Sequence, residues 1–407
     1  MVWRCLMAFL AGVALLGTPI PAAAAPIDTP KPEGAQRFLG PTVIGSNYKV
    51  NPVVRSDGMM RIFDVETSYG QFQFAGVEFT KMRLRELDAA AAIDKMSQSD
   101  RFMNAFGRAA IAPVQFGANL ITNPVDTINR SMSGVANMFE RGAAGLANAS
   151  DDRDNIFDSL VGVSDTQREL AIELGVDPYT DFPPLAERLK QMAGAMAGGS
   201  LPVKAGLSFV PGGVGIAISS VSSVEGAKDT LRSKTPPQLL VEMRGNLQKL
   251  DVPPESIDHL AANRNYTPSD LLIMSRALVQ LHAQDSSIFV DDAAAANTRD
   301  LAFYERRLAE LMAARSGALG GLVAFVRVAG HPINVNRSGN SVAIYPLDDI
   351  SWTDNVRRAF TTTTAQLHGE RPGALHPAFV TTGAVTPMAA QEIKKLGWQL
   401  VKVKPLP

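Results

Sequence analysis

The stretch that most constrains the fold is Ala193–Val224, a long run in which Lys204 is the only charged residue. Glycine, serine and alanine dominate it, and Pro211-Gly212-Gly213 predicts a turn inside it. A run with so little charge has to pack against another part of the chain, a partner or a membrane.

Small residues in this stretch recur at helical spacing and therefore share a face. The positions predicted to form the ridge are Gly194 and Gly198 on one segment and Gly215, Ser219, Ser223 and Ala227 on the next. A ridge without large side chains lets a second backbone approach closely. We predict a small-residue helical hairpin. It is either a core element or a surface that docks on a partner or bilayer, and the small transfer energy of glycine and serine favours the core.

The N-terminus has the pattern of an export signal. Arg4 is followed by the apolar segment Cys5–Gly17 and then by Ala22-Ala23-Ala24, which matches a cleavage site. We predict that residues 1–24 are a signal peptide cleaved after Ala24, and that the protein is exported to a bacterial periplasm. The only cysteine is Cys5, so the mature chain contains none and no disulfide stabilises it.

Length and composition predict a folded protein of two or three domains. The chain has 407 residues, of which 46% are hydrophobic and 19% charged. Its net charge of −1 provides no basic field for nucleic acid, so we predict no nucleic-acid partner.

The first ordered region is predicted to be β-structure. Residues 25–47 are proline-rich at the start and read as a flexible lead-in. In residues 48–79, Phe63, Val65 and Thr67 alternate with polar neighbours, a period typical of a strand. Turn signals at Ser56-Asp57-Gly58 and Tyr69-Gly70 predict two consecutive hairpins.

Residues 80–318 are predicted to be a helical region. Ser164 and the segment Thr267-Pro268-Ser269-Asp270 are start signals for helices, and Asp291–Ser316 is expected to be one long helix. The loop Asp177–Pro184 holds carboxylates that read as helix caps in an ordered connector. Calcium is the less favoured interpretation, because it requires six to eight oxygen ligands.

Residues 319–407 are predicted to form a small α/β domain with a partly parallel sheet. Strands are expected at Leu322–Val328, Ile333–Asn336, Val342–Tyr345, Ala378–Thr382 and Trp398–Val403, with helices at Thr353–Leu367 and from Pro387 to Gly397. The predicted fold is therefore mainly α with β: an N-terminal β-hairpin segment, a central helical bundle containing the small-residue hairpin, and a C-terminal α/β unit.

The best candidate for a ligand site is the carboxyl edge of this last sheet, where open α/β sheets bind ligands. The residues expected there are Asp348, Asp349, Thr381, Thr382, Gly383 and Thr386, the last at a helix N-terminus suited to an anion. The alternative is that these residues only make turns and helix caps.

Specific catalytic patterns are missing from the sequence. The five histidines show no metal-ligand spacing, and there is no G-x-S-x-G elbow or phosphate-binding loop. We therefore predict neither a metal site nor a cofactor. His331 and His376 precede prolines at predicted strand starts, and are expected at the end of the sheet opposite the Asp348–Asp349 pair.

Two functions remain open. The first is a non-enzymatic envelope protein that acts through a protein partner or the membrane surface by means of the helical hairpin. The second is a periplasmic enzyme or a binding module for an anion or small ligand, with its site at the strand ends of the C-terminal domain. The sequence predicts neither the oligomeric state of the protein nor whether it is an enzyme.

Overall fold

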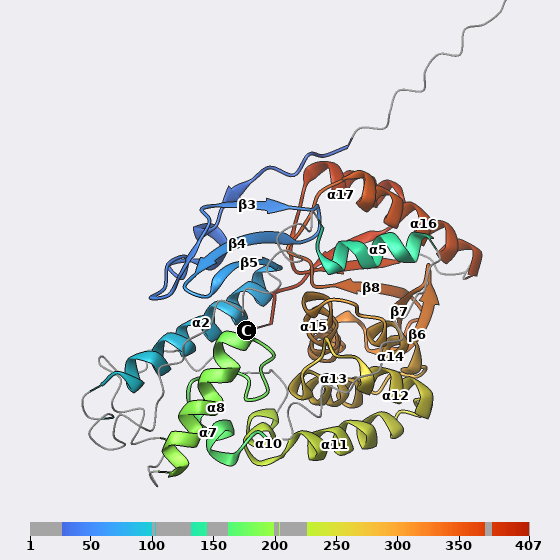
Figure 1. Ribbon diagram of the computed structural model, residues 1–407. Helices are drawn as coiled ribbons and strands as arrows, with labels where there is room; N and C mark the ends of the chain where they lie inside the picture. The colour runs from blue at the N-terminus through green and yellow to red at the C-terminus, as the bar shows by residue number, and fades with distance from the viewer. Residues whose placement is uncertain are drawn as a thin grey trace, which may run out of the picture.

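The structure is a computed structural model, and it describes residues 27–99, 102, 132–144, 162–198, 203, 226–370 and 377–406. It confirms the predicted fold class (Figure 1). An antiparallel sheet lies at the N-terminal end, helices follow, and the C-terminal sheet contains parallel pairs.

The N-terminal sheet is built around β4 (Arg61–Thr67). The other strands are β1 (Glu33–Gly34), β2 (Tyr48–Val50), β3 (Val53–Ser56) and β5 (Gly70–Ala75). Strands β3 and β5 both run antiparallel to β4, so the two predicted hairpins are confirmed. Alternate side chains of β4, Phe63 and Val65, are buried as the period of two predicts.

The interpretation of residues 25–47 as a flexible lead-in needs correction. Strand β1 pairs with β3, and α1 (Gln36–Leu39) follows it. Ala35 and Leu39 are buried in the core of the N-terminal sheet. The proline-rich composition did not predict these contacts. The segment is held by the pairing of β1 with β3 and by two buried side chains, Ala35 and Leu39, and a short sequence pattern does not reveal either.

Three helices complete the core of the N-terminal sheet. They are α2 (Val77–Ser97), α7 (Asp165–Glu173) and α8 (Pro183–Gly198), and Phe303 from a later helix joins them. The predicted cap at Ser164 is confirmed, since its side chain accepts a hydrogen bond from the backbone N–H of Gln167.

Helix α10 (Ala227–Ser233) packs mainly against α7. Five further helices share the largest hydrophobic core of the described residues with the C-terminal sheet, and the last two of them contact that sheet directly. They are α11 (Pro236–Gln248), α12 (Pro254–Ala262), α13 (Pro268–Leu281), α14 (Ser287–Ala294) and α15 (Arg299–Arg315), and the single turn η2 (Gly317–Leu319) follows them. The predicted cap at the start of α13 is confirmed, and it takes the form of a capping box in which the Thr267 and Asp270 side chains each accept from the other's backbone N–H.

The prediction of a single helix over Asp291–Ser316 is wrong. Helix α14 ends at Ala294, and α15 starts afresh at Arg299 behind Thr298, whose side chain accepts from the backbone N–H of Leu301. The alanine run before Thr298 favours helix throughout, so the break depends on the cap and on the packing of the two helices against different neighbours.

The C-terminal sheet has the order β12–β10–β8–β7–β6. Its strands are β6 (Leu322–Val328), β7 (His331–Asn336), β8 (Ser341–Tyr345), β10 (Ala378–Thr381) and β12 (Gln399–Lys402). Strands β8, β10 and β12 are parallel, whereas β7 is antiparallel to β8 and β6. A separate short pair, β9 (Asp349–Ile350) with β11 (Ala384–Val385), extends beyond the strand ends.

Helices cover both faces of this sheet. Helices α5 (Gly134–Ala144), α16 (Asp354–Glu370) and α17 (Pro387–Lys395) lie on one side, and α13, α14 and α15 lie on the other (Figure 1). The carboxyl ends of β8 and β10 point toward the N-terminal sheet and the start of α2. That junction is where the two main cores meet.

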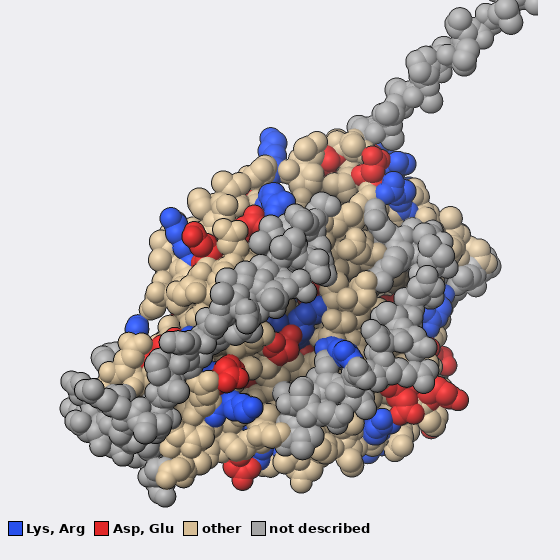
Figure 2. All heavy atoms as spheres, viewed as in Figure 1, with Lys and Arg blue, Asp and Glu red and all other residues tan. Residues whose placement is uncertain are grey.

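Within the described residues, no helix is both long and apolar enough to cross a bilayer. Figure 2 shows acidic and basic side chains interspersed over the face in view, without a large patch of one sign among the coloured residues.

Candidate functional site

A cavity of about 210 Å³ lies at the carboxyl edge of the C-terminal sheet. Its wall combines the start of α2, one side of α15, the segments that follow β8 and β10, and the last residues of the described chain. The lining residues that matter for its chemistry are Glu78, Lys81, Tyr304, Arg307, Asp348 and Thr382. The edge predicted from the sequence therefore borders an actual cavity.

Asp348 borders the cavity, and its carboxylate is held by the N-terminal region of the protein. It accepts hydrogen bonds from the backbone N–H of Arg61 at 2.8 Å and of Val77 at 3.0 Å. Burial raises the pKa of Asp348 to about 7, although these two N–H groups act in the opposite direction. The side chain caps α2 and ties it to the end of β8.

Asp349 points away from this cap and joins a second set of contacts. Its carboxylate lies 3.1 Å from Nη2 of Arg61 and accepts from the hydroxyl of Ser56 at 3.0 Å. Arg61 also pairs with Glu33 at 2.6 Å. Burial raises the pKa of Asp349, and the charge of Arg61 opposes that shift. Both predicted acidic residues thus bind the N-terminal sheet.

The turn after β10 forms the neighbouring wall. Thr381 is fully buried at the end of the strand, and the Thr382 hydroxyl donates to the carbonyl of Leu347 at 3.0 Å. At Gly383 a Cβ atom would lie 2.5 Å from the backbone carbonyl of Asp348. Glycine is required here because the two backbones touch.

Thr386 caps α17 as predicted, accepting from the backbone N–H of Ala389 at 3.1 Å. Its hydroxyl also donates to Asp28, whose carboxylate accepts from the backbone N–H of Trp352 at 2.8 Å. A carboxylate of this chain therefore lies where an anionic ligand was expected. The ligand-binding role of Thr386 stays a prediction.

The cations in the cavity wall are paired. Lys81 lies 3.0 Å from Glu78, and Arg307 lies 2.9 Å from Glu310 while also donating to the carbonyl of Leu406 at 3.4 Å. Much of the remaining wall is apolar and includes Phe79, Phe303, Leu311 and Leu347. Such a wall suits a small molecule that is partly apolar and carries a hydrogen-bonding group.

The expected position of His331 was wrong. Because β7 is antiparallel to β8, its first residue lies at the same end of the sheet as the last residue of β8. Phe139 bridges them, with ring centroids 5.4 Å from His331 and 4.9 Å from Tyr345. His331 therefore lies at the candidate edge. His376 falls outside the described residues.

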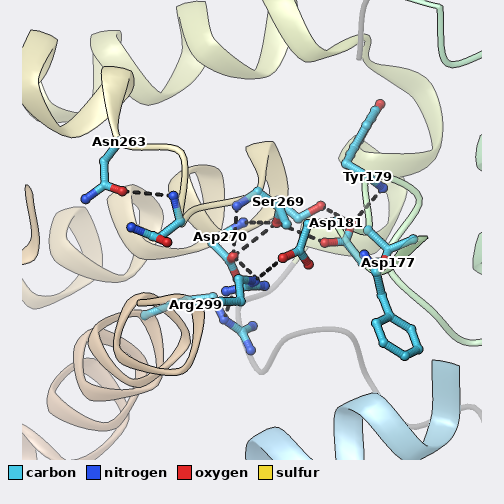
Figure 3. A network of polar contacts seen from close by, with 12 residues as sticks. Asp177, Tyr179, Asp181, Asn263, Ser269, Asp270 and Arg299 are labelled. Carbon is cyan, nitrogen blue, oxygen red and sulfur yellow. Dashed lines mark hydrogen bonds and ion pairs between the residues drawn. The ribbon is translucent and has the colours of Figure 1, made fainter. Parts of the chain in front are cut away.

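A buried ionic network connects the two main cores (Figure 3). Arg299 on α15 pairs with Asp270 at 2.9 Å and with Asp181 at 3.1 Å, and Arg83 on α2 contacts Asp181 at 3.0 Å. Burial raises the pKa of Asp181, but the two arginines outweigh it and bring the value down to about 2.

Asp177 lies beside this network. It accepts from the backbone N–H of Tyr179 at 2.9 Å and from the hydroxyl of Thr267, also at 2.9 Å. Burial, and then the charge of Asp270, raise its pKa to about 6. The connector of residues 177–184 is thus an ordered junction. Sequence reasoning found the loop but missed its arginine partners, since no local pattern links positions so far apart.

The predicted packing ridge is only partly visible. Gly215, Ser219 and Ser223 lie outside the described residues. Gly194 and Gly198 are exposed on α8, and no described atom lies within 4 Å of the Cβ position at either glycine. Ala227 is buried at the start of α10. The hairpin contact therefore stays a prediction.

Across the described ranges, no group of three or more histidine, cysteine, aspartate or glutamate side chains is arranged to hold a metal ion. Comparison of the chain with protein-family models, curated proteins and solved structures gave no match.

Proposed function

We propose that this protein binds a small, partly apolar molecule in the cavity at the carboxyl edge of its C-terminal sheet. The observation that carries the proposal is the cavity itself, about 210 Å³ in volume, at the end of parallel strands β8 and β10. Open α/β sheets bind ligands at this edge. The cavity opens to the surface beside the Lys81–Glu78 pair, and a concave, largely apolar site with a few polar groups is the usual form of a small-ligand site.

The surroundings of the cavity support binding. Its walls belong to elements held by Asp348, Asp349 and the ionic network, so the cavity is formed before a ligand arrives. A preformed site loses less conformational entropy on binding. The Lys81–Glu78 pair is about two-fifths exposed and can exchange its partner for a polar group of the ligand.

The site is proposed to operate in the periplasm, since the sequence of residues 1–24 predicts export. N-terminal sequencing of the mature protein and fractionation of cells test this predicted location. A mature chain that retains Met1, or that stays in the cytoplasmic fraction, would contradict it.

The other proposed role is docking to an envelope partner or membrane surface through the small-residue hairpin. It is supported by the bare, exposed surface of Gly194 and Gly198. Membrane fractions washed with carbonate or high salt test it. Recovery of all the protein as a soluble monomer before any wash would count against docking.

Binding in the cavity is tested by thermal unfolding with a panel of small organic acids, amines and neutral compounds. The substitution Leu311→Phe places extra volume in the cavity, because Leu311 lines it and is 1% exposed. The matched control is Val241→Phe, which adds the same ring at a position 71% exposed on α11.

We expect at least one compound to raise the melting temperature of the natural protein and of Val241→Phe, and to lose this effect in Leu311→Phe. A panel without any effect, or an equal effect on both variants, would contradict ligand binding in the cavity.

A further inference from the structure

A second group of polar side chains from four different elements lies close enough together for its members to act on one another electrostatically, and one of them, Tyr304, also lines the cavity. It consists of Asp292 on α14, Tyr304 and Glu305 on α15, His331 on β7 and Tyr345 on β8. We call it the edge cluster. The ring of Phe139 from α5 packs against its His331 and Tyr345 side. The cluster lies just beneath the surface, since the side chains of His331 and Asp292 are 8% and 13% exposed.

Several polar atoms of the edge cluster lack a hydrogen-bond partner in the part of the chain that the structure describes. They are the Tyr304 hydroxyl, Oε2 of Glu305, and both ring nitrogens of His331. Nδ1 of His331 lies 3.7 Å from Oδ1 of Asp292, which is too long for a hydrogen bond. Tyr304, Glu305 and His331 are each at least nine-tenths buried.

Such a concentration is unusual, because native proteins leave few buried polar groups unpaired and each one destabilises the fold. A chain under selection for stability alone would carry apolar side chains here. Proteins keep destabilising groups where a function needs them, so several unpaired polar atoms at one place are expected if they form hydrogen bonds to a ligand.

The charge state of the cluster restricts what it can bind. Burial, and then the charge of Asp292, raise the pKa of Glu305 well above its usual range, which favours the uncharged carboxyl group. Burial likewise raises the pKa of Tyr304 and of Tyr345, and both hydroxyls stay protonated. Asp292 at the rim disfavours an anion. A cation is best bound by carboxylates, and burial disfavours the ionised form of Glu305.

We propose that the edge cluster binds a neutral, hydroxyl-bearing molecule such as a polyol or sugar. A hydroxyl both donates and accepts hydrogen bonds, which matches the mixture of unpaired groups offered by Tyr304, Glu305 and His331. The aromatic rings of Phe139 and Tyr345 supply an apolar surface for the carbon skeleton. This inference rests on the unpaired atoms and not on the cavity, although Tyr304 belongs to both the edge cluster and the cavity wall.

The first test compares two buried tyrosines. The Tyr304 hydroxyl has no partner among the described residues, whereas the Tyr266 hydroxyl donates to the carbonyl of Ala293 at 2.8 Å. We expect Tyr304→Phe to leave the melting temperature unchanged or raise it by about 1–3 °C, and Tyr266→Phe to lower it by about 2–4 °C. A comparable fall for both variants would overturn the proposal.

The second test measures binding of myo-inositol, glucose and galactose to the full chain by calorimetry. We expect at least one of them to bind, and the affinity to fall at least tenfold in Glu305→Met and in His331→Phe. Glu305→Gln preserves size and still offers a donor and an acceptor, so binding is expected to persist in this variant. Binding that is unchanged in both Glu305→Met and His331→Phe, or absent for all three probes, would overturn the proposal.

Leu311→Phe separates the two proposals. It adds volume to the cavity without replacing any residue of the edge cluster, so polyol or sugar binding through Glu305 and His331 is expected to persist in this variant. Loss of such binding in Leu311→Phe, with retention in His331→Phe, would assign the ligand to the cavity and refute the edge-cluster site.

Discussion

The carboxylate of Asp348 accepts hydrogen bonds from the backbone N–H of Val77, with oxygen–nitrogen distances of 3.0 and 3.2 Å. Asp348 follows the third-last strand of the C-terminal sheet, and Val77 is the first residue of the helix that leaves the N-terminal sheet. A side chain from one end of the chain thus caps a helix at the other. The candidate site lies at this junction, so its shape depends on both sheets.

The first prediction concerns this cap. Asp348→Ala removes the acceptor for the backbone N–H groups of Arg61 and Val77. We expect the free energy of unfolding to fall by about 2 kcal/mol, since two buried donors lose their partner. Urea denaturation measures the change. Asp258→Ala is the control, because Asp258 is 61% exposed, and its effect should stay within about 0.5 kcal/mol.

The second prediction is a pH dependence from the same residue. The folded-state pKa of Asp348 is raised to about 7, against an ordinary value of about 3.9. The folded protein therefore holds this proton more tightly than the unfolded chain. The resulting stability is fully present below about pH 4 and is lost as the pH rises through about 7, and it amounts to at most about 4 kcal/mol.

Asp348→Asn provides the comparison for this pH dependence, because it keeps an oxygen acceptor but cannot titrate. We expect the natural protein to lose stability between pH 4 and 7 relative to this variant, as measured by denaturation at each pH. Parallel stability curves for the two proteins would show that Asp348 titrates normally.

The third prediction concerns the ionic network. Arg299→Met leaves the buried carboxylate of Asp270 and that of Asp181 without this arginine. We expect a loss of about 3–5 kcal/mol, which is typical when one partner of a buried ion pair is removed. The same change at Arg327, whose pair with Asp291 is nearly half exposed, should cost less than about 1 kcal/mol. Equal effects at the two sites would mean that the network does not hold the cores together.

The fourth prediction compares two glycines. Gly383→Ala places a methyl group 2.5 Å from the backbone of Asp348, so we expect a loss of about 1–3 kcal/mol and a distorted cavity wall. Gly194 lies on the exposed face of α8 with open space at its Cβ position. The change Gly194→Ala should therefore increase the free energy of unfolding by about 0.5–1 kcal/mol. Thermal unfolding measures both. A destabilised Gly194→Ala variant would instead reveal a packing partner on that face.

Much of the fold follows from short-range patterns. Ser164, Thr267 and Thr386 cap helices where the sequence predicts caps, because a cap depends on a side chain and the backbone two or three residues away. The alternation of buried and polar residues around Phe63, and the apolar runs of the C-terminal strands, are likewise properties of a few neighbouring residues.

The predictions that failed needed longer-range information. Placing His331 required knowing that β7 is antiparallel to β8, and the sequence pattern near its proline does not contain that fact. Docking of Leu39 and the break before Thr298 also depended on which surfaces were available nearby. The candidate edge was found because all carboxyl ends of parallel strands meet on one side. The sequence analysis did not identify Tyr304 and Glu305 as residues near this edge, because the pattern of α15 is that of an ordinary buried helix.

The sequence by itself determined most of the helices and strands and the shared edge at the ends of β8 and β10, because caps and alternation depend on neighbouring residues. Only the tertiary structure decided what Asp348, His331 and Arg299 do. The pKa and the partners of a buried polar group are set by atoms that reach it from elsewhere in the fold, and for Asp348 these atoms come from positions 287 and 271 residues away in the chain.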